Sequence, residues 1–189
     1  MTEITFAKKL VAESIGTVFL LATVVGSGIM AESLAGGNVA IALLGNTLAT
    51  GCILMVLISI FGPISGAHFN PAVTLSFWLQ QQISDREAAF YIIVQIIAAI
   101  AGAVLAHIMF DMPDLVMAST KVRTGVGIWI AEFVATFGLL ATILGCIRLR
   151  PDAVPYAVGL YISAGYWFTS STSFANPAVT IARTMTDSF

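Results

Sequence analysis

The organisation of the chain is decided by two stretches that read alike. They are Ser65-Gly66-Ala67-His68-Phe69-Asn70-Pro71-Ala72-Val73-Thr74 and Ser173-Phe174-Ala175-Asn176-Pro177-Ala178-Val179-Thr180. Each places Asn-Pro-Ala-Val-Thr between a small, flexible segment and an apolar run. Asn favours the N-cap of a helix, and Pro suits the first helical position because no backbone N–H is needed there. Both stretches therefore predict the start of a helix.

The runs that follow, 70–80 and 176–186, are too short to cross a bilayer, since each has about ten residues and a spanning helix needs about 20. Each is predicted to be a half-helix whose N-terminus lies inside the membrane. Non-helical backbone at that depth is tolerated only where it is buried in protein or lines a wet cavity. Two half-helices at matching places of two chain halves indicate a pore built from an inverted repeat.

The composition is that of a polytopic membrane protein. Of the 189 residues, 58% are hydrophobic and 10% are charged, whereas a soluble domain has about 25% charged residues. The apolar run after Lys8 and Lys9 continues to about Met30, longer than the core of a signal peptide, and therefore predicts a retained span. No basic patch indicates nucleic-acid binding. No nucleophile, base or metal cluster indicates an enzyme, and neither a metal nor a cofactor is expected.

Five apolar runs, of which this retained span is the first, are interpreted as full membrane spans. They cover residues 6–30, 38–61, 88–110, 125–147 and 156–168. Lys and Arg indicate their orientation, because cytoplasmic loops carry an excess of both. With a cytoplasmic N-terminus, Lys121 and Arg123 fall outside. The basic residues that then fall inside are Lys8, Lys9, Arg86, Arg148 and Arg150.

The chain divides into two repeats. The first, 1–110, holds three spans and the half-helix 70–80. A connecting loop, 111–124, leads to the second repeat, 125–189, which holds two spans and the half-helix 176–186. The halves match again at Ala12-Glu13-Ser14-Ile15-Gly16-Thr17 and Ala131-Glu132-Phe133-Val134-Ala135-Thr136. These copies lie three spans apart, an odd number, so the repeat is inverted.

The paired Asn-Pro-Ala motifs, the lead-in at 65–69 and the Ala-Glu-x-x-x-Thr repeat strongly resemble the aquaporin and aquaglyceroporin family, the major intrinsic proteins. The resemblance covers nearly the whole chain. It implies an all-α membrane protein with an aquaporin-like inverted repeat, here five full spans plus two half-helices. The family has six spans, so the sixth is absent from this chain. A truncated fragment is favoured over a partner chain or lipid on the exposed face. The resemblance also implies a homotetramer in the lipid bilayer, in a bacterial inner (plasma) membrane.

The resemblance further implies that the half-helices meet tip to tip at mid-membrane. The pore motifs are then Asn70, Pro71, Ala72, Asn176, Pro177 and Ala178. Each helix N-terminus carries roughly half a positive charge, which repels cations while neutral molecules pass. The asparagine amides can donate hydrogen bonds to water and turn it so that no proton moves along the file. Simple N-capping is the alternative role, and the two are compatible.

Several polar residues are placed by the same resemblance. Glu13 and Glu132 lie inside spans, where an ionisable group is costly unless paired or hydrogen-bonded. In the family such glutamates accept bonds from the loop backbone before each half-helix, and this structural role is expected here rather than proton coupling. Gln95 can bond a neighbouring helix. His68 stands where the family has a lumen-edge histidine, with structural hydrogen bonding as the alternative. His107 is expected at the interface.

The family narrows its pore toward the outside with four residues, which counting from the asparagines places at Thr50, Ala164 or its neighbour Gly165, Ser173 and Val179. Water-selective members usually carry an aromatic, a histidine and an arginine here, and glycerol channels keep the arginine. This chain has neither a bulky aromatic nor a histidine at these positions, and Val179 stands where arginine is expected. A wide, weakly polar constriction is therefore predicted.

Such a constriction should admit water, glycerol, urea and metalloid acids. The chain resembles a bacterial subgroup that lacks the filter arginine and is associated with arsenite, As(OH)3, which is neutral at physiological pH. Arg183 lies four residues after Val179, on the same helix face, and is expected to line the outer vestibule. An arginine that snorkels to the interface or anchors the missing sixth span is the alternative.

The leading hypothesis is a passive channel for small neutral solutes with proton exclusion at the paired motifs. A water-selective aquaporin is the first alternative, opposed by the absent arginine and aromatic. A non-conducting, truncated structural membrane protein is the second, because the sixth span is missing. An ion-coupled transporter is disfavoured, since Glu13 and Glu132 lie near the starts of spans rather than at the midplane.

Overall fold

The computed structural model describes residues 4–188, and within that range every regular element is helical. The helices are α1 (Phe6–Leu34), α2 (Val39–Ser65), α3 (Pro71–Leu79), α4 (Asp85–Met109), α5 (Val126–Leu149), the 3-10 turn η1 (Pro151–Ala153), α6 (Val154–Phe168) and α7 (Pro177–Arg183). The predicted all-α fold is confirmed.

Four helices, α1, α2, α4 and α5, are long and apolar enough to cross a membrane. Thr5, Asn38 and Ser84 cap α1, α2 and α4, each accepting a bond from a backbone N–H two or three residues later. The fifth predicted span is α6, which has 15 residues, fewer than the about 20 of a full span. The 3-10 turn η1 directly precedes α6 and lengthens this helical segment at its N-terminal end.

One boundary differs instructively from the prediction. The second span was expected to stop before Pro63, but α2 continues through Pro63 to Ser65. It ends at Gly66, whose φ of 87° is left-handed, a conformation that glycine adopts without the steric cost of a side chain. The first pore loop therefore begins at this glycine.

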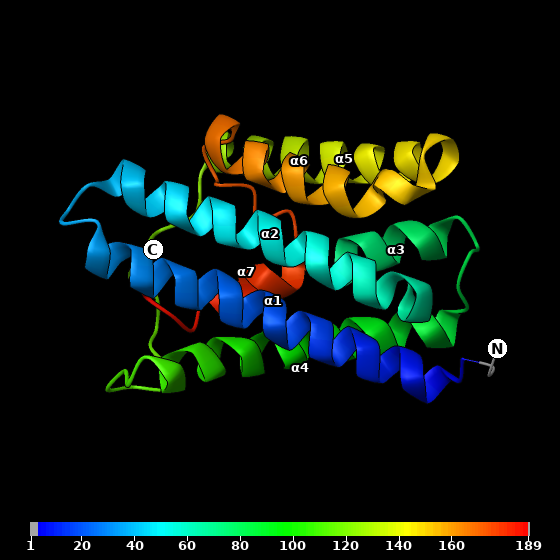
Figure 1. The fold of residues 1–189 in the computed structure, drawn as a ribbon, viewed down its shortest axis with the longest axis horizontal. Coiled ribbons are helices and arrows are strands. Elements are labelled where there is room, and N and C mark those ends of the chain that lie inside the picture. The colour runs from blue at the N-terminus through cyan, green and yellow to red at the C-terminus, as the bar shows by residue number, and fades with distance from the viewer. Residues whose placement is uncertain (1–3, 189) are drawn as a thin grey trace.

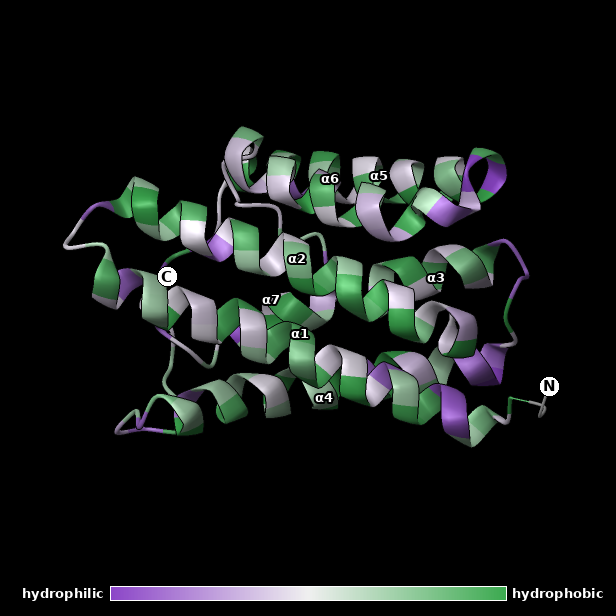
Figure 2. Cartoon of the chain, in the orientation of Figure 1, coloured by the Kyte–Doolittle hydropathy of each residue, from purple (hydrophilic) through white to green (hydrophobic). Residues whose placement is uncertain are grey.

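The long helices form two groups, α1 with α2 and α4, and α5 with α6, around the two short helices α3 and α7 (Figure 1). α1 packs between α2 and α4, while α6 packs on α2 and α5 packs on α6. The half-helices α3 and α7 lie between these groups, with their N-termini toward each other. Figure 2 shows hydrophilic residues gathered mainly at the two ends of the bundle and in the loops, and mostly apolar or neutral shafts. This pattern matches a bundle whose helices run across a bilayer.

Glycines allow the helices to approach closely, as small residues do in membrane proteins. A Cβ added at Gly102 of α4 would lie 2.5 Å from the carbonyl oxygen of Val18 in α1. A Cβ added at Gly159 of α6 would lie 2.6 Å from the carbonyl oxygen of Gly51 in α2. Both contacts involve backbone atoms, which cannot move aside as a flexible side chain can.

The second repeat has no counterpart of α4 among the described residues. In the first repeat α4 packs against α1 and α3. In the second, the outer face of α5 stays open, with Phe133 70% exposed and Phe137 66% exposed. This is the exposed face that five spans were expected to leave.

The Gly102 contact generates a prediction. Gly102→Ala should lower the unfolding free energy by about 1–3 kcal/mol, because an overpacked interface must shift its backbone. Gly145→Ala in α5 is the matched control, since a Cβ there meets nothing within 4 Å. Thermal unfolding in detergent micelles measures both. Equal melting temperatures for the two variants would contradict the proposed close contact.

Candidate functional site

Each half-helix begins at the asparagine predicted to start it. The Oδ1 of Asn70 accepts a hydrogen bond from the N–H of Ala72 at 2.8 Å, and that of Asn176 accepts from Ala178 at 3.0 Å. Pro71 and Pro177 occupy the first helical positions. The predicted N-caps are therefore present in both repeats. The second half-helix is shorter than the expected 176–186, because α7 ends at Arg183.

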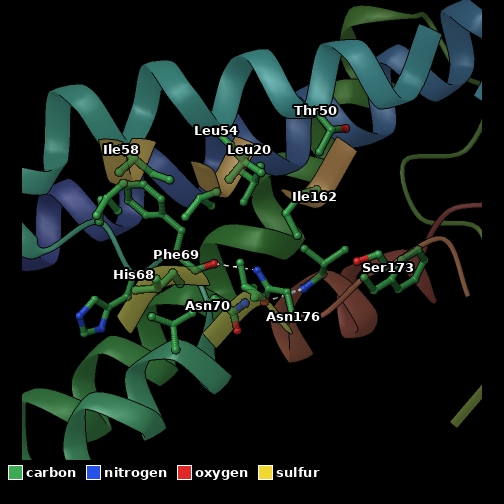
Figure 3. Close-up of a pocket in the computed structure, with 18 of the residues that line it drawn as sticks. Leu20, Thr50, Leu54, Ile58, His68, Phe69, Asn70, Ile162, Ser173 and Asn176 are labelled. Atoms are coloured by element: carbon green, nitrogen blue, oxygen red, sulfur yellow. Dashed lines mark hydrogen bonds between the residues drawn. The ribbon is translucent and has the colours of Figure 1, made fainter. Parts of the chain in front are cut away.

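The two tips meet through reciprocal hydrogen bonds. The Nδ2 of Asn70 donates to the carbonyl oxygen of Ala175 at 2.7 Å, and the Nδ2 of Asn176 donates to the carbonyl oxygen of Phe69 at 2.9 Å. Figure 3 shows both asparagines beside the same pocket, with the bond from Asn176 to the carbonyl oxygen of Phe69 dashed. Because an amide NH2 has two donors, each asparagine retains a second N–H after bonding the opposite loop.

Both loops before the half-helices are wound in the left-handed region at matching positions. In the first loop φ is 87° at Gly66, 50° at Ala67 and 48° at Phe69. At the equivalent positions of the second loop φ is 59° at Thr172, 51° at Ser173 and 46° at Ala175. Only Gly66 among these is a glycine. Such conformations cost about 1–3 kcal/mol each and persist only where the surroundings enforce them.

Two glutamates from the long helices enforce them. Glu13 of α1 accepts from the N–H of His68 at 3.0 Å and that of Phe69 at 2.7 Å. Glu132 of α5 accepts from the N–H groups of the two equivalent residues in the second loop, at 3.0 and 2.8 Å. The expected bonds from glutamate to loop backbone are thus present in both repeats.

The two glutamates differ in how many further partners they have. Glu13 is fully buried and also accepts from the Ser65 hydroxyl at 2.6 Å and from the Nε2 of Gln95 at 2.8 Å. Gln95 comes from α4, so this helix supports the first pore loop directly. Glu132 is only half-buried, and its two backbone bonds are its hydrogen bonds within the described chain.

A cavity of about 100 Å³ lies against the two tips. Its long-helix wall consists of stripes spaced four residues apart, the spacing of one helix face. These stripes are Leu20 and Val24 on α1; Thr50, Leu54 and Ile58 on α2; Leu139, Ile143 and Ile147 on α5; and Val154, Val158, Ile162 and Tyr166 on α6. Asn70 and Asn176 are among its few polar lining groups. This volume is enough for several water molecules.

Three of the four predicted filter residues line this cavity: Thr50, Ser173 and Val179. The prediction of Ala164 is wrong, because its side chain is exposed outside the cavity. Its neighbour Gly165 is buried, and a Cβ added there would lie 2.5 Å from the Oγ of Ser173. One residue turns a helix by about 100°, so Gly165 and not Ala164 faces Ser173.

Two aromatic residues of this region were not predicted from the sequence. Tyr166 is buried, lines the cavity and donates its hydroxyl to the Oγ1 of Thr50 at 3.2 Å. Phe174 lines the cavity next to Ser173. The constriction is therefore more aromatic than expected. Tyr166 could have been found from the four-residue spacing that links it to Ile162.

These observations can be set beside known proteins. The family model described as "Major intrinsic protein" matches residues 1–180. The chain belongs to the major intrinsic protein family. Members of this family are channels and not enzymes, which confirms the prediction that the chain is not an enzyme. The chain is an integral membrane protein of a family that transports water and small solutes.

Relatives and a solved structure agree with this assignment. Aquaglyceroporin AqpS of Rhizobium meliloti (strain 1021) is 57% identical over 189 residues, which cover 100% of this chain and 80% of that protein. Aquaporin NIP1-1 of Arabidopsis thaliana is 32% identical over 167 residues, covering 84% of this chain and 55% of that protein. The X-ray structure of the aquaglyceroporin from Plasmodium falciparum matches with a TM-score of 0.77 and 20% identity, covering 95% and 80% of the two chains. At that identity the likeness shows the fold alone.

Two histidines of this major intrinsic protein are buried. His68 lines the cavity, and its Nδ1 lies 3.1 Å from the Oγ1 of Thr74, so both roles expected for it are present. His107 was expected at the interface, but it is fully buried. Its Nδ1 lies 2.8 Å from the carbonyl oxygen of Leu115 and its Nε2 lies 2.8 Å from the Oγ1 of Thr186. His107 therefore ties α4 to the connecting loop and to the segment after α7.

Arg183 lies at a second hollow, of about 490 Å³, beside the central cavity. It is 6% exposed, so it does not snorkel to the interface. Its guanidinium donates to the hydroxyl and the carbonyl oxygen of Ser188 at 3.1 and 2.8 Å. Phe174 lines both hollows. Among residues 4–188 there is no group of three His, Cys, Asp or Glu side chains that could hold a metal ion.

The difference between the glutamates generates a prediction. Glu13→Ala leaves four donors without their acceptor, and Glu132→Ala leaves two. Each orphaned buried group costs about 1–3 kcal/mol, so Glu13→Ala should lower the unfolding free energy more. Denaturation in mixed micelles compares them. A loss for Glu132→Ala that equals or exceeds that for Glu13→Ala would contradict the account.

Proposed function

We propose that this chain forms a passive transmembrane pore for small neutral solutes, namely water, glycerol, urea and arsenite as its neutral acid, and that the pore excludes protons at the paired Asn-Pro-Ala motifs. One observation carries the proposal: amides from two opposed half-helices, Asn70 and Asn176, share one narrow, mostly apolar cavity. A passing molecule with a lone pair can accept from the amide N–H that each asparagine retains.

Proton exclusion rests on the direction of the bonds and dipoles at the tips. Both amides donate, so a water molecule between them accepts both hydrogen bonds through its oxygen. Its lone pairs are then occupied, and it cannot accept a proton from a neighbouring water molecule. The N-termini of α3 and α7 add partial positive charge at the same place. Glycerol and urea carry no net charge and are not repelled.

The filter supports solutes larger than water. Thr50, Gly165, Ser173 and Val179 are small or uncharged, and the Tyr166 hydroxyl is bonded to Thr50. Val179 offers neither charge nor donors, where an arginine would narrow and polarise the passage. The printed name of the relative AqpS, an aquaglyceroporin, agrees with glycerol-sized solutes. The arsenite proposal depends on the same missing arginine.

The cavity wall opposes the non-conducting alternative. Long-helix lining comes from α1, α2, α5 and α6, and α4 contributes none of it. A counterpart of α4 in the second repeat would, by the internal symmetry, also stand outside the wall. The described residues therefore supply every helix that the lining needs. The water-selective alternative retains some support from Tyr166, an aromatic residue at the constriction.

We place the pore in a bacterial plasma membrane with a cytoplasmic N-terminus. Lys9 pairs with Glu87 at 2.8 Å near the end where α1 begins and α4 begins, and the connecting loop lies at the opposite end (Figure 1). The excess of Lys and Arg on the N-terminal side agrees with this orientation. A homotetramer, with the open apolar face of α5 covered by neighbours or lipid, is part of the proposal.

Stopped-flow light scattering on proteoliposomes tests the function. Rapid reswelling in glycerol or urea is expected, together with water flux. Water flux without solute entry would favour the water-selective alternative, and the absence of both would favour the structural one.

The filter itself is tested by Val179→Arg. A guanidinium at this position should slow glycerol entry about tenfold, equivalent to about 1.4 kcal/mol of added barrier, while water flux persists. Val179→Ala is the matched control and should keep glycerol entry at the wild-type rate. Unchanged glycerol entry in Val179→Arg would show that this position lies outside the solute path.

A further inference from the structure

The connecting loop brings an arginine to the hollow beside the central cavity. Arg123 lies two residues before the N-cap of α5 and is exposed. Its Nη1 donates to the carbonyl oxygen of Ser171 at 2.9 Å and contacts the Oγ1 of Thr172 at 3.4 Å. A loop residue is thus bonded to the wound segment that immediately precedes the filter residue Ser173.

The guanidinium of Arg123 also covers the ring of Phe174. Its Cζ lies 4.1 Å from the ring centroid, well within the roughly 6 Å range of a cation–π contact. The Cζ of Arg183 lies 5.7 Å from the same centroid. Because Phe174 lines the central cavity, one aromatic ring links two fixed cations to the outer end of the solute path.

The side chains that line the adjoining hollow include three basic residues and one acidic residue. Lys121, Arg123, Arg183 and Glu132 are the charged residues that line the adjoining hollow. The carboxylate of Glu132 accepts from the backbone N–H groups of Phe174 and Ala175 and keeps its negative charge. Arg183 is buried and bonded to Ser188, whereas Arg123 is exposed.

We propose that Arg123 is a specificity-determining residue: it supplies from the connecting loop the fixed positive charge that position 179 of the filter lacks, and Phe174 and Ser171 hold it at the mouth. Neutral solutes pass beside it, and small inorganic cations are repelled before they reach the asparagines. This inference rests on the proposed function, since it assigns cation exclusion to a particular side chain of that same pore.

The planar guanidinium suits this position better than an ammonium group would. Its Cζ lies 4.1 Å from the ring centroid of Phe174 while its Nη1 donates to the carbonyl oxygen of Ser171. Lysine carries the charge but cannot combine a planar stack with an in-plane donor. Arg123→Lys should therefore keep most of the cation exclusion, because it keeps the positive charge. Arg123→Gln removes that charge and should remove the cation exclusion.

The test measures cation leak and glycerol entry on the same proteoliposomes. Sodium and potassium influx are followed with ion-sensitive dyes trapped in the vesicles, and glycerol entry is followed by light scattering. Arg123→Gln should raise cation influx about tenfold, a barrier change of about 1.4 kcal/mol, with glycerol entry within about twofold of wild type. The double variant Arg123→Gln/Val179→Arg should restore cation exclusion, because it returns a charge to the path.

Arg150→Gln is the matched control, because Arg150 is an exposed arginine after α5 at the opposite end of the bundle. It should change neither flux. Cation influx in Arg123→Gln at the wild-type rate would overturn the inference. Loss of glycerol entry in Arg123→Gln without a cation leak would also overturn it, since Arg123 would then only anchor the loop. A wild-type protein that admits no glycerol would contradict the proposed function instead, so the two failures are distinguishable.

Discussion

The pair of hydrogen bonds between the half-helix tips is the constraint on which the rest of the structure depends. Chain that stops being helical in mid-membrane exposes carbonyl and N–H groups where no lipid can satisfy them. Asn70 and Asn176 solve this reciprocally, because each amide bonds a carbonyl of the opposite loop while its Oδ1 caps its own helix. The same bonds place two partly free amides in one cavity, so the solution to a folding problem also supplies the hydrogen-bond donors of the proposed pore.

The long helices hold these tips in position. Glu13 and Glu132 bind the loop N–H groups that the left-handed turns direct toward them. The first loop is held more firmly than the second, because Gln95 and Ser65 also bond Glu13. In the second repeat the connecting loop supplies an additional contact, through Arg123. The two repeats therefore share a backbone design but differ in the side chains that stabilise it.

Much of this could be predicted from the sequence, because Asn-Pro motifs and apolar runs are local signals. The N-caps at Asn70 and Asn176 follow from the Asn-Pro motifs, and the glutamate bonds were implied by the resemblance to the family. Ala164 was wrong because counting cannot determine the rotation of α6. The contact between Arg123 and Phe174 could not be predicted, since it joins an irregular loop to a residue 51 positions away in sequence, and no periodicity connects them.

A double-mutant cycle on the unfolding free energy in mixed micelles tests the central claim most directly. Asn70→Ser and Asn176→Ser keep an N-cap oxygen, because serine caps helices about as well as asparagine, but they remove the amide that reaches the opposite loop. If the tips hold each other, either single change already separates them, and the double variant should lose at least about 0.5 kcal/mol less than the sum of the single losses. Losses that add to within about 0.3 kcal/mol would contradict the account.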